Sequence, residues 1–120
     1  GAGSAFGPGD VIHACRACEV SGECHVGQNR AGGESILDFT AGSTATFRYA
    51  DSALPFTSAS VAAAGAGIVE ILLNGRSAGR VTLTGGRSQP TAISDTGTGK
   101  RTVVISAVSG SLHIESITLD

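Results

Sequence analysis

Three cysteines and two histidines lie close together near the start of the chain. They are His13, Cys15, Cys18, Cys24 and His25, in the order H-x-C-x2-C-x5-C-H. Two chemistries suit this density: a disulfide in an oxidising compartment, or a zinc site, because thiolate and imidazole are ligands that Zn2+ prefers. A redox-active C-x-x-C is a third, although no βαβ pattern surrounds it.

A disulfide explains the cysteines most simply, because two thiols would pair and the third would stay free. A Cys18–Cys24 bond would join the chain on either side of Ser21-Gly22, whereas a Cys15–Cys18 bond would close a tight ring, and the sequence does not choose between them. A strand would place His13 and Cys15 on one face, but the spacing matches no standard zinc finger. We predict one disulfide, with zinc binding as the alternative.

Catalytic motifs are missing from the sequence. Ser, His and Asp all occur, but no G-x-S-x-G elbow does. The acidic pairs Glu34 with Asp38 and Asp51 with Asp95 lie near turns or at strand positions where solvated charges are far commoner than glycosidase carboxylates. The run at 97–100, GTGK, lacks the G-x-x-x-x-G-K-[ST] spacing of a phosphate loop. We expect no enzymatic activity.

The composition limits the size of the fold and the kinds of partner that can be expected. The 120 residues fit one domain, and 41% hydrophobic against 15% charged residues is typical of a chain that folds. The chain has eight Lys or Arg residues and ten Asp or Glu residues, and its longest basic run is the pair Lys100-Arg101. A nucleic-acid partner is therefore not expected. The longest apolar stretch, 59–73, is broken by Gly, Ser and Glu and is too short to span a membrane.

Alternating apolar residues between turn signals predict strands throughout the chain. Asn74-Gly75 and the run 108–111, VSGS, are predicted hairpin turns. Ala62 to Ala64 could instead begin a helix, but Gly65 and Gly67 would stop it. The predicted strands are 11–15, 23–28, 35–39, 44–49, 57–63, 68–73, 80–84, 89–94, 102–108 and 112–119.

Short strands at this spacing predict an all-β fold, a β-sandwich (jelly roll) of nine to ten antiparallel strands. We place this single domain at 11–120, with 1–10 as an N-terminal extension whose opening Gly1-Ala2-Gly3-Ser4 is interpreted as a cloning remnant. The predicted core residues are Ile68, Leu72, Val81, Leu83, Val103 and Ile105.

Several segments, taken in order, match a series of known motifs. The segments from Phe56 on are FTSASVAAAGAGIVEI and LLNGRSAGRVTLTGG, and the others are VIHACRACEVSG, HVGQNRAGGESILDF and SGSLHIESITL. Together they resemble family 6 carbohydrate-binding modules or the related family 35-like modules. The first two resemble the family's F-T-x-R-V-A-S strand, Gly-rich turn, I-E-I-R-L strand, G-x-x-x-G-x-V-x-V hairpin and T-G-G, and the other three its opening, its V-G-x-I-x-x-G-D-W-I-x-Y segment and its closing strand. The resemblance implies a jelly-roll module that binds glycans without cleaving them and is attached to, or secreted alongside, enzymes that attack polysaccharides.

The resemblance also implies where a sugar would bind and how this chain departs from the family. Two aromatic rings normally clamp a sugar ring, but Gln28 stands at the first position and Arg87-Ser88-Gln89 covers the second. His113 replaces the polar ligand residue, usually Asn, of the last strand. We therefore predict a polar or degenerate sugar site made by Gln28, Asn29, Arg87 and His113, with weak binding and a preference for acidic sugars.

The resemblance also implies a structural calcium site, but this chain has different residues at most of its ligand positions. His13 and Cys15 stand where the resemblance places carboxylates, and only Glu115 keeps an acidic side chain. Ca2+ prefers oxygen ligands, so calcium is not expected there, whereas zinc would suit His13 and Cys15 with Glu115.

The predicted function is that of a secreted, non-catalytic carbohydrate-binding module. Its predicted partners are a polysaccharide or oligosaccharide and a parent glycoside hydrolase. The alternative is a structural or protein-interaction sandwich that has lost sugar binding, which the absence of Trp and the single Tyr49 would favour.

Overall fold

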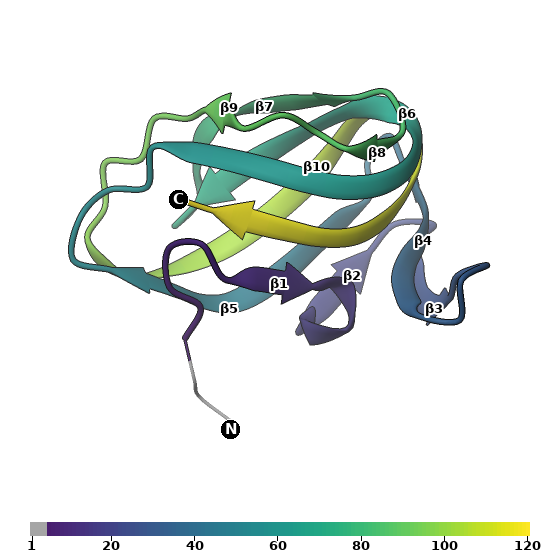
Figure 1. Cartoon of the computed structure of the whole chain (residues 1–120), viewed down its shortest axis with the longest axis horizontal. Coiled ribbons are helices and arrows are strands. Elements are labelled where there is room, and N and C mark those ends of the chain that lie inside the picture. The colour runs from purple at the N-terminus through teal and green to yellow at the C-terminus, as the bar shows by residue number, and fades with distance from the viewer. Residues whose placement is uncertain (1–4) are drawn as a thin grey trace.

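The computed structural model describes residues 5–120, which form almost entirely antiparallel strands (Figure 1). The only helical element in this range is a 3-10 turn, η1, at Ala14–Arg16, and no helix here is long and apolar enough to cross a membrane. The predicted all-β fold is confirmed, while Gly1 to Ser4 lie outside the described residues. The strands are β1 Val11–His13, β2 Glu19–Ser21, β3 His25–Gln28, β4 Glu34–Thr40, β5 Thr44–Ser52, β6 Ser58–Leu73, β7 Arg76–Leu83, β8 Gly86–Arg87, β9 Thr91–Ala92 and β10 Gly99–Leu119.

Two long strands, β6 and β10, pair along nearly their whole length and take part in both layers of the sandwich. In one layer, the first half of β6 also pairs with β8 and β9, while the second half of β10 pairs with β1 and β4, and β4 with β3. In the other layer, the second half of β6 pairs with β7, and the first half of β10 with β5, which pairs with β2. Figure 1 shows the two layers closing toward each other.

Glycines let the two long strands bend side by side from one layer into the other. Gly110 of β10 lies opposite Gly67 of β6 and has a φ of 85°. A Cβ on Gly110 would collide with the carbonyl oxygen of Ala66 and the Cα of Gly67. The predicted hairpin at 108–111 and the predicted break between 63 and 68 were therefore wrong, because these glycines permit close approach within continuous strands rather than reversal of the chain.

The predicted hairpin at Asn74-Gly75 is confirmed. Both residues have positive φ, 52° and 79°, and the flanking Leu73 and Arg76 pair in register. This backbone conformation matches the two-residue turn that joins β6 to β7 with the right twist.

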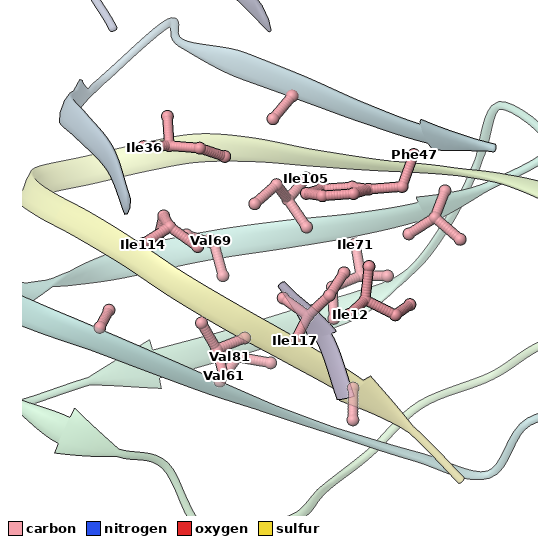
Figure 2. Close-up of a cluster of buried hydrophobic side chains, with 14 of the residues drawn as sticks. Ile12, Ile36, Phe47, Val61, Val69, Ile71, Val81, Ile105, Ile114 and Ile117 are labelled. Atoms are coloured by element: carbon pink, nitrogen blue, oxygen red, sulfur yellow. The ribbon is translucent and has the colours of Figure 1, made fainter. Parts of the chain in front are cut away.

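The hydrophobic core fills the space between the layers (Figure 2). Four predicted core residues, Val81, Leu83, Val103 and Ile105, are buried as expected. Ile68 and Leu72 were predicted wrongly and are only half-buried, because β6 turns its odd-numbered side chains inward in this stretch. The inward positions of this half of β6 are Val69, Ile71 and Leu73. Each aliphatic side chain that is fully buried contributes about 1.5–3 kcal/mol to stability.

A buried ion pair joins the loop before β10 to the rest of the sandwich. Arg101 Nη2 lies 2.8 Å from Asp95 Oδ2, and the two side chains are 0% and 2% exposed. Asp95 was expected to be a solvated charge, but its carboxylate accepts backbone N–H bonds from Phe56 and Gly97 as well. Burial raises the pKa of Asp95, yet these two hydrogen bonds and the Arg101 guanidinium outweigh burial, so the pKa is lowered overall.

The segment before β1 is attached to the sandwich through Phe6. Its backbone N–H donates to the carbonyl of Tyr49, and its carbonyl accepts from the N–H of Asp51. The ring packs against the core and lies under the guanidinium of Arg16, 5.3 Å from the ring centre.

Candidate functional site

A groove of about 440 Å³ opens where the β3–β4 loop meets the second half of β10. Three of the four side chains predicted to contact sugar, Gln28, Asn29 and His113, line it together. They come from positions 28–29 and 113, so the pairing of β4 between β3 and β10 is what brings them into one site. The other lining residues are Arg30, Ala31, Ser35, Leu37, Ala64 and Glu115.

Asn29 organises the loop on one side of the groove. Its amide oxygen accepts the backbone N–H groups of Ala31 and Gly33 at 3.0 and 3.1 Å, and its amide nitrogen donates to Ser35 Oγ at 2.9 Å. Both acceptor sites of the amide oxygen are thus occupied, and one N–H remains for a ligand. Asn29 therefore acts first as a positioning residue for this loop.

His113 is held by a hydrogen bond from the bulge in β4. The backbone N–H of Asp38, which has a φ of 56°, donates to Nδ1 of His113 at 3.2 Å. The register between β4 and β10 shifts here, because Ile36 and Phe39 of β4 are three residues apart whereas their partners in β10 are only two residues apart. A nitrogen that accepts a hydrogen bond carries no proton, so the neutral imidazole has its proton on Nε2 and can donate to a ligand.

The remaining lining combines a small apolar floor with two opposite charges. Ala64 lies opposite His113 in the β6–β10 pairing, and Leu37 contributes from β4. Arg30 and Glu115 give the groove one positive and one negative side chain. Arg30 and Leu37 were not predicted as site residues; the only sequence signal for them is the Asn and two Gly residues within 29–33, which are typical of a tight loop.

Arg87, the fourth predicted sugar-contact residue, lies elsewhere. It belongs to β8, pairs in register with Ala62 of β6, and lines a second hollow between β7 and the β8–β9 segment. Strand β6 separates this hollow from the groove, and no lining residue is shared between the two.

The groove offers hydrogen bonding and small apolar contacts rather than aromatic stacking. None of the described residues that line it is Phe, Tyr or Trp. Tyr49 lies on β5, with Lys100 Nζ 5.5 Å from its ring centre, and takes no part in the groove.

The predicted disulfide is absent, and all three cysteines are free thiols in the structure. Cys24 is buried, and its thiol donates to the carbonyl of Ser21 at 3.2 Å, whereas Cys15 and Cys18 are exposed. The predicted disulfide, named as Cys18 with Cys24 although the pairing was left open, is wrong in this structure because Cys18 precedes β2 and is exposed, whereas Cys24 follows β2 and is buried.

The residues predicted to hold a metal are not brought together. His13 ends β1 opposite Ser116, Cys15 lies in η1, and Glu115 lines the groove. Across residues 5–120, no three His, Cys, Asp or Glu side chains are grouped so as to hold a metal ion. The side chains present therefore do not fit a metal site at this position.

Comparison with known proteins gives matches by structure and none by sequence. No model of a protein family matches the chain, and neither does any protein with a curated description. CsCBM6-3 from Clostridium stercorarium, solved in complex with cellobiose, superposes with a TM-score of 0.85 at 18% identity over 98% of both chains. A family 6 carbohydrate-binding module from Clostridium cellulolyticum, in complex with xylose, gives 0.76 at 19% identity over 95% of this chain and 98% of that one.

A third match lies within a larger enzyme. A glycoside hydrolase family 43 arabinoxylan arabinofuranohydrolase from Bacillus subtilis, in complex with cellotetraose, gives a TM-score of 0.75 at 13% identity. The match covers 97% of this chain but 28% of the hydrolase chain. The chain therefore has, over almost its whole length, the β-sandwich fold of the family 6 carbohydrate-binding modules.

Proposed function

We propose that this chain is a non-catalytic carbohydrate-binding module that binds a glycan in the groove between the β3–β4 loop and β10. The observation that carries the proposal is the convergence of Gln28, Asn29 and His113 on one groove. Gln28 is exposed, and His113 presents its Nε2–H, so both can bond to sugar hydroxyls. A concave site with a few fixed polar groups is typical of small-ligand binding.

The structural neighbours support the same function. CsCBM6-3 and the Clostridium cellulolyticum module were solved with cellobiose and xylose, which favours sugar binding over the alternative of a purely structural sandwich. The match to part of a Bacillus subtilis arabinofuranohydrolase supports a parent glycoside hydrolase for this module. A module of this kind would act outside the cell, where polysaccharides are found, and we propose that the chain is secreted.

Binding by this groove should be weak. Stacking of sugar on aromatic rings is a large part of the contact in sites that have such rings, and the groove has none. We expect a Kd on the order of a millimolar, about 4 kcal/mol. The groove itself gives no preference for an acidic glycan, because Arg30 and Glu115 supply one charge of each sign and Arg87 lines the second hollow instead.

Isothermal titration calorimetry with cellotetraose, xylotetraose and an oligogalacturonide tests the proposal. Gln28→Ala should weaken the binding of the neutral sugars, whereas Gln89→Ala, the same change in the second hollow, should leave it unchanged. A chain that binds none of a broad array of plant and fungal glycans, or that binds them equally well in both variants, would contradict the proposed site.

A further inference from the structure

The second hollow, of about 410 Å³, lies between β7 and the segment that carries β8 and β9. Alternate residues of β7 and the residue after it, Arg80, Thr82 and Thr84, are exposed there, while Val81 and Leu83 between them are buried in the core. Alternation along the strand thus puts polar side chains on the hollow and apolar ones inside. The lining also includes Gly85, Arg87, Ser88, Gln89 and Thr91.

The charge of this hollow differs from that of the groove. Two guanidinium groups, those of Arg80 and Arg87, line it, and none of its described lining residues is Asp or Glu. The groove instead pairs Arg30 with Glu115. An anionic group would therefore meet a carboxylate in the lining of the groove, whereas in the hollow the nearest carboxylate, that of Glu70, is already paired with Arg80, so the hollow is the better place for it.

Two of the donors around the hollow, Arg80 and Ser88, have partners that leave hydrogen-bonding groups free. Nε of Arg80 lies 3.6 Å from Oε2 of Glu70, the residue opposite it on β6, and Glu70 also accepts a hydrogen bond from Ser77 Oγ at 3.0 Å. This contact engages the Nε side of the guanidinium and leaves its terminal nitrogens for a ligand. Ser88 Oγ accepts the N–H of Val61 at 2.9 Å, so its own hydroxyl proton is available to donate.

We infer that the hollow lined by Arg80 and Arg87 binds the anionic substituent of a glycan, a carboxylate of a uronic acid or a sulfate ester. Guanidinium groups bind such planar or tetrahedral oxyanions through paired N–H donors, and the hydroxyls of Thr82, Thr84 and Ser88 suit the neighbouring sugar hydroxyls. The inference rests on the proposed function, because it takes the ligand to be a glycan, but it assigns the recognition of acid to a site apart from the groove.

Nuclear magnetic resonance of the 15N-labelled chain separates the two sites. The probes are an oligogalacturonide, an oligosaccharide of sulfated galactose and cellotetraose. The acidic probes should shift the amide signals of 80–91, and cellotetraose should shift those of the groove at 28–31 and 113 instead. Binding of only one acidic probe in the hollow supports the inference and identifies the anion as carboxylate or sulfate.

Paired variants test the role of the two arginines. The double variant Arg80→Gln with Arg87→Gln should bind the acidic probes about tenfold or more weakly, as expected when hydrogen bonds to charged groups are lost. Arg16→Gln with Arg76→Gln removes the same charge outside both sites and should change binding little. Glu70→Gln should strengthen binding, because it removes the carboxylate that competes for Arg80. Well-dispersed spectra and unchanged Tm values would show that the variants fold.

The outcomes distinguish this inference from the proposed function. If cellotetraose shifts the groove while neither acidic probe shifts 80–91, the hollow is not an anion site and the proposed function stands. Equal weakening by the two arginine pairs would also overturn the inference, since only net charge would then matter. If no probe shifts either site, both proposals fail.

Discussion

Nδ1 of His113 accepts a hydrogen bond from the backbone N–H of Asp38, 3.2 Å away, across the β4 bulge. Asp38 has a positive φ, and its N–H is turned to a side chain instead of to a backbone carbonyl of β10. The same bond therefore completes the bulge and orients the imidazole, so that the groove and the strand irregularity depend on each other.

The variant His113→Asn separates these two roles. The Asn side-chain oxygen can replace Nδ1 as acceptor for the Asp38 N–H, but the shorter side chain does not reach as far as Nε2. We expect a Tm close to that of the unmodified chain and glycan binding weakened by about tenfold, the equivalent of ~1.4 kcal/mol. His113→Ala should lose binding but lower the Tm only slightly, because the exposed Asp38 N–H exchanges this hydrogen bond for one to water.

The imidazole nitrogen shifts give an independent measurement of the same bond. Long-range 1H–15N spectra of the neutral imidazole should show the proton of His113 on Nε2. A proton on Nδ1 would be incompatible with the hydrogen bond from Asp38 and would contradict this account of the groove.

Sequence patterns predicted the fold class well and the course of the two longest strands badly. Glycine near 65 and 110 is the usual signal of a turn, and the alternation on either side of it reads the same whether the chain reverses or bends. Whether the chain bends or reverses depends on the pairing of Gly67 in β6 with Gly110 in β10. These residues are about forty positions apart, so no local window of the sequence contains both. By contrast, Asn74-Gly75 acts through its own backbone preference and was predicted correctly.

Gly67→Ala tests the close approach of β6 and β10. The added Cβ would collide with the carbonyl oxygen of Ser109, and we expect the free energy of unfolding to fall by about 3 kcal/mol or more. Gly42→Ala is the control, because Gly42 has a φ of 92° but open space around it, and should cost only about 1–2 kcal/mol. Urea denaturation measures both, and equal losses would contradict the packing at the bend.

The buried pair of Asp95 and Arg101 predicts a dependence of stability on pH. The pKa of Asp95 is lowered in the folded chain from its ordinary value of 3.8. Its contribution is therefore fully present above that value and is lost as the pH falls toward the lower folded pKa. We expect Asp95→Asn to lower the free energy of unfolding by about 3–5 kcal/mol at neutral pH, since Arg101 stays buried without a partner charge.

The pH profile provides the check on that variant. The difference in stability between Asp95→Asn and the unmodified chain should narrow as the pH is lowered below about 4. A difference that is constant from pH 7 to pH 2 would show that the loss has a cause other than the charge of Asp95.

Thiol labelling tests the state of the cysteines. Under native conditions two thiols should react, those of Cys15 and Cys18, because Cys24 is buried. Under denaturing, non-reducing conditions all three should react. A single reactive thiol in the unfolded chain would instead support the disulfide expected from the sequence.

Three of the four predicted sugar-contact residues meet in the groove, and the fourth does not. Gln28 and Asn29 lie at the end of β3 and His113 lies in β10, and β4 pairs with both strands, so collinear resemblance was enough to place them together. Arg87 is displaced because β8 pairs with the edge of β6 opposite β10, and no local pattern in the sequence reveals this long-range pairing. The burial of Asp95 was predicted wrongly for a similar reason. Its pairing with Arg101 forms only when the loop before β10 folds back onto the sandwich, and no local pattern indicates it.

A crystal structure of the chain with a bound oligosaccharide such as cellotetraose tests directly whether the groove binds sugar. We expect a sugar ring in the groove, with hydroxyl groups within hydrogen-bond distance of Nε2 of His113 and of the side-chain amide of Gln28. An oligosaccharide seated on another face of the sandwich, with the groove empty, would contradict this expectation.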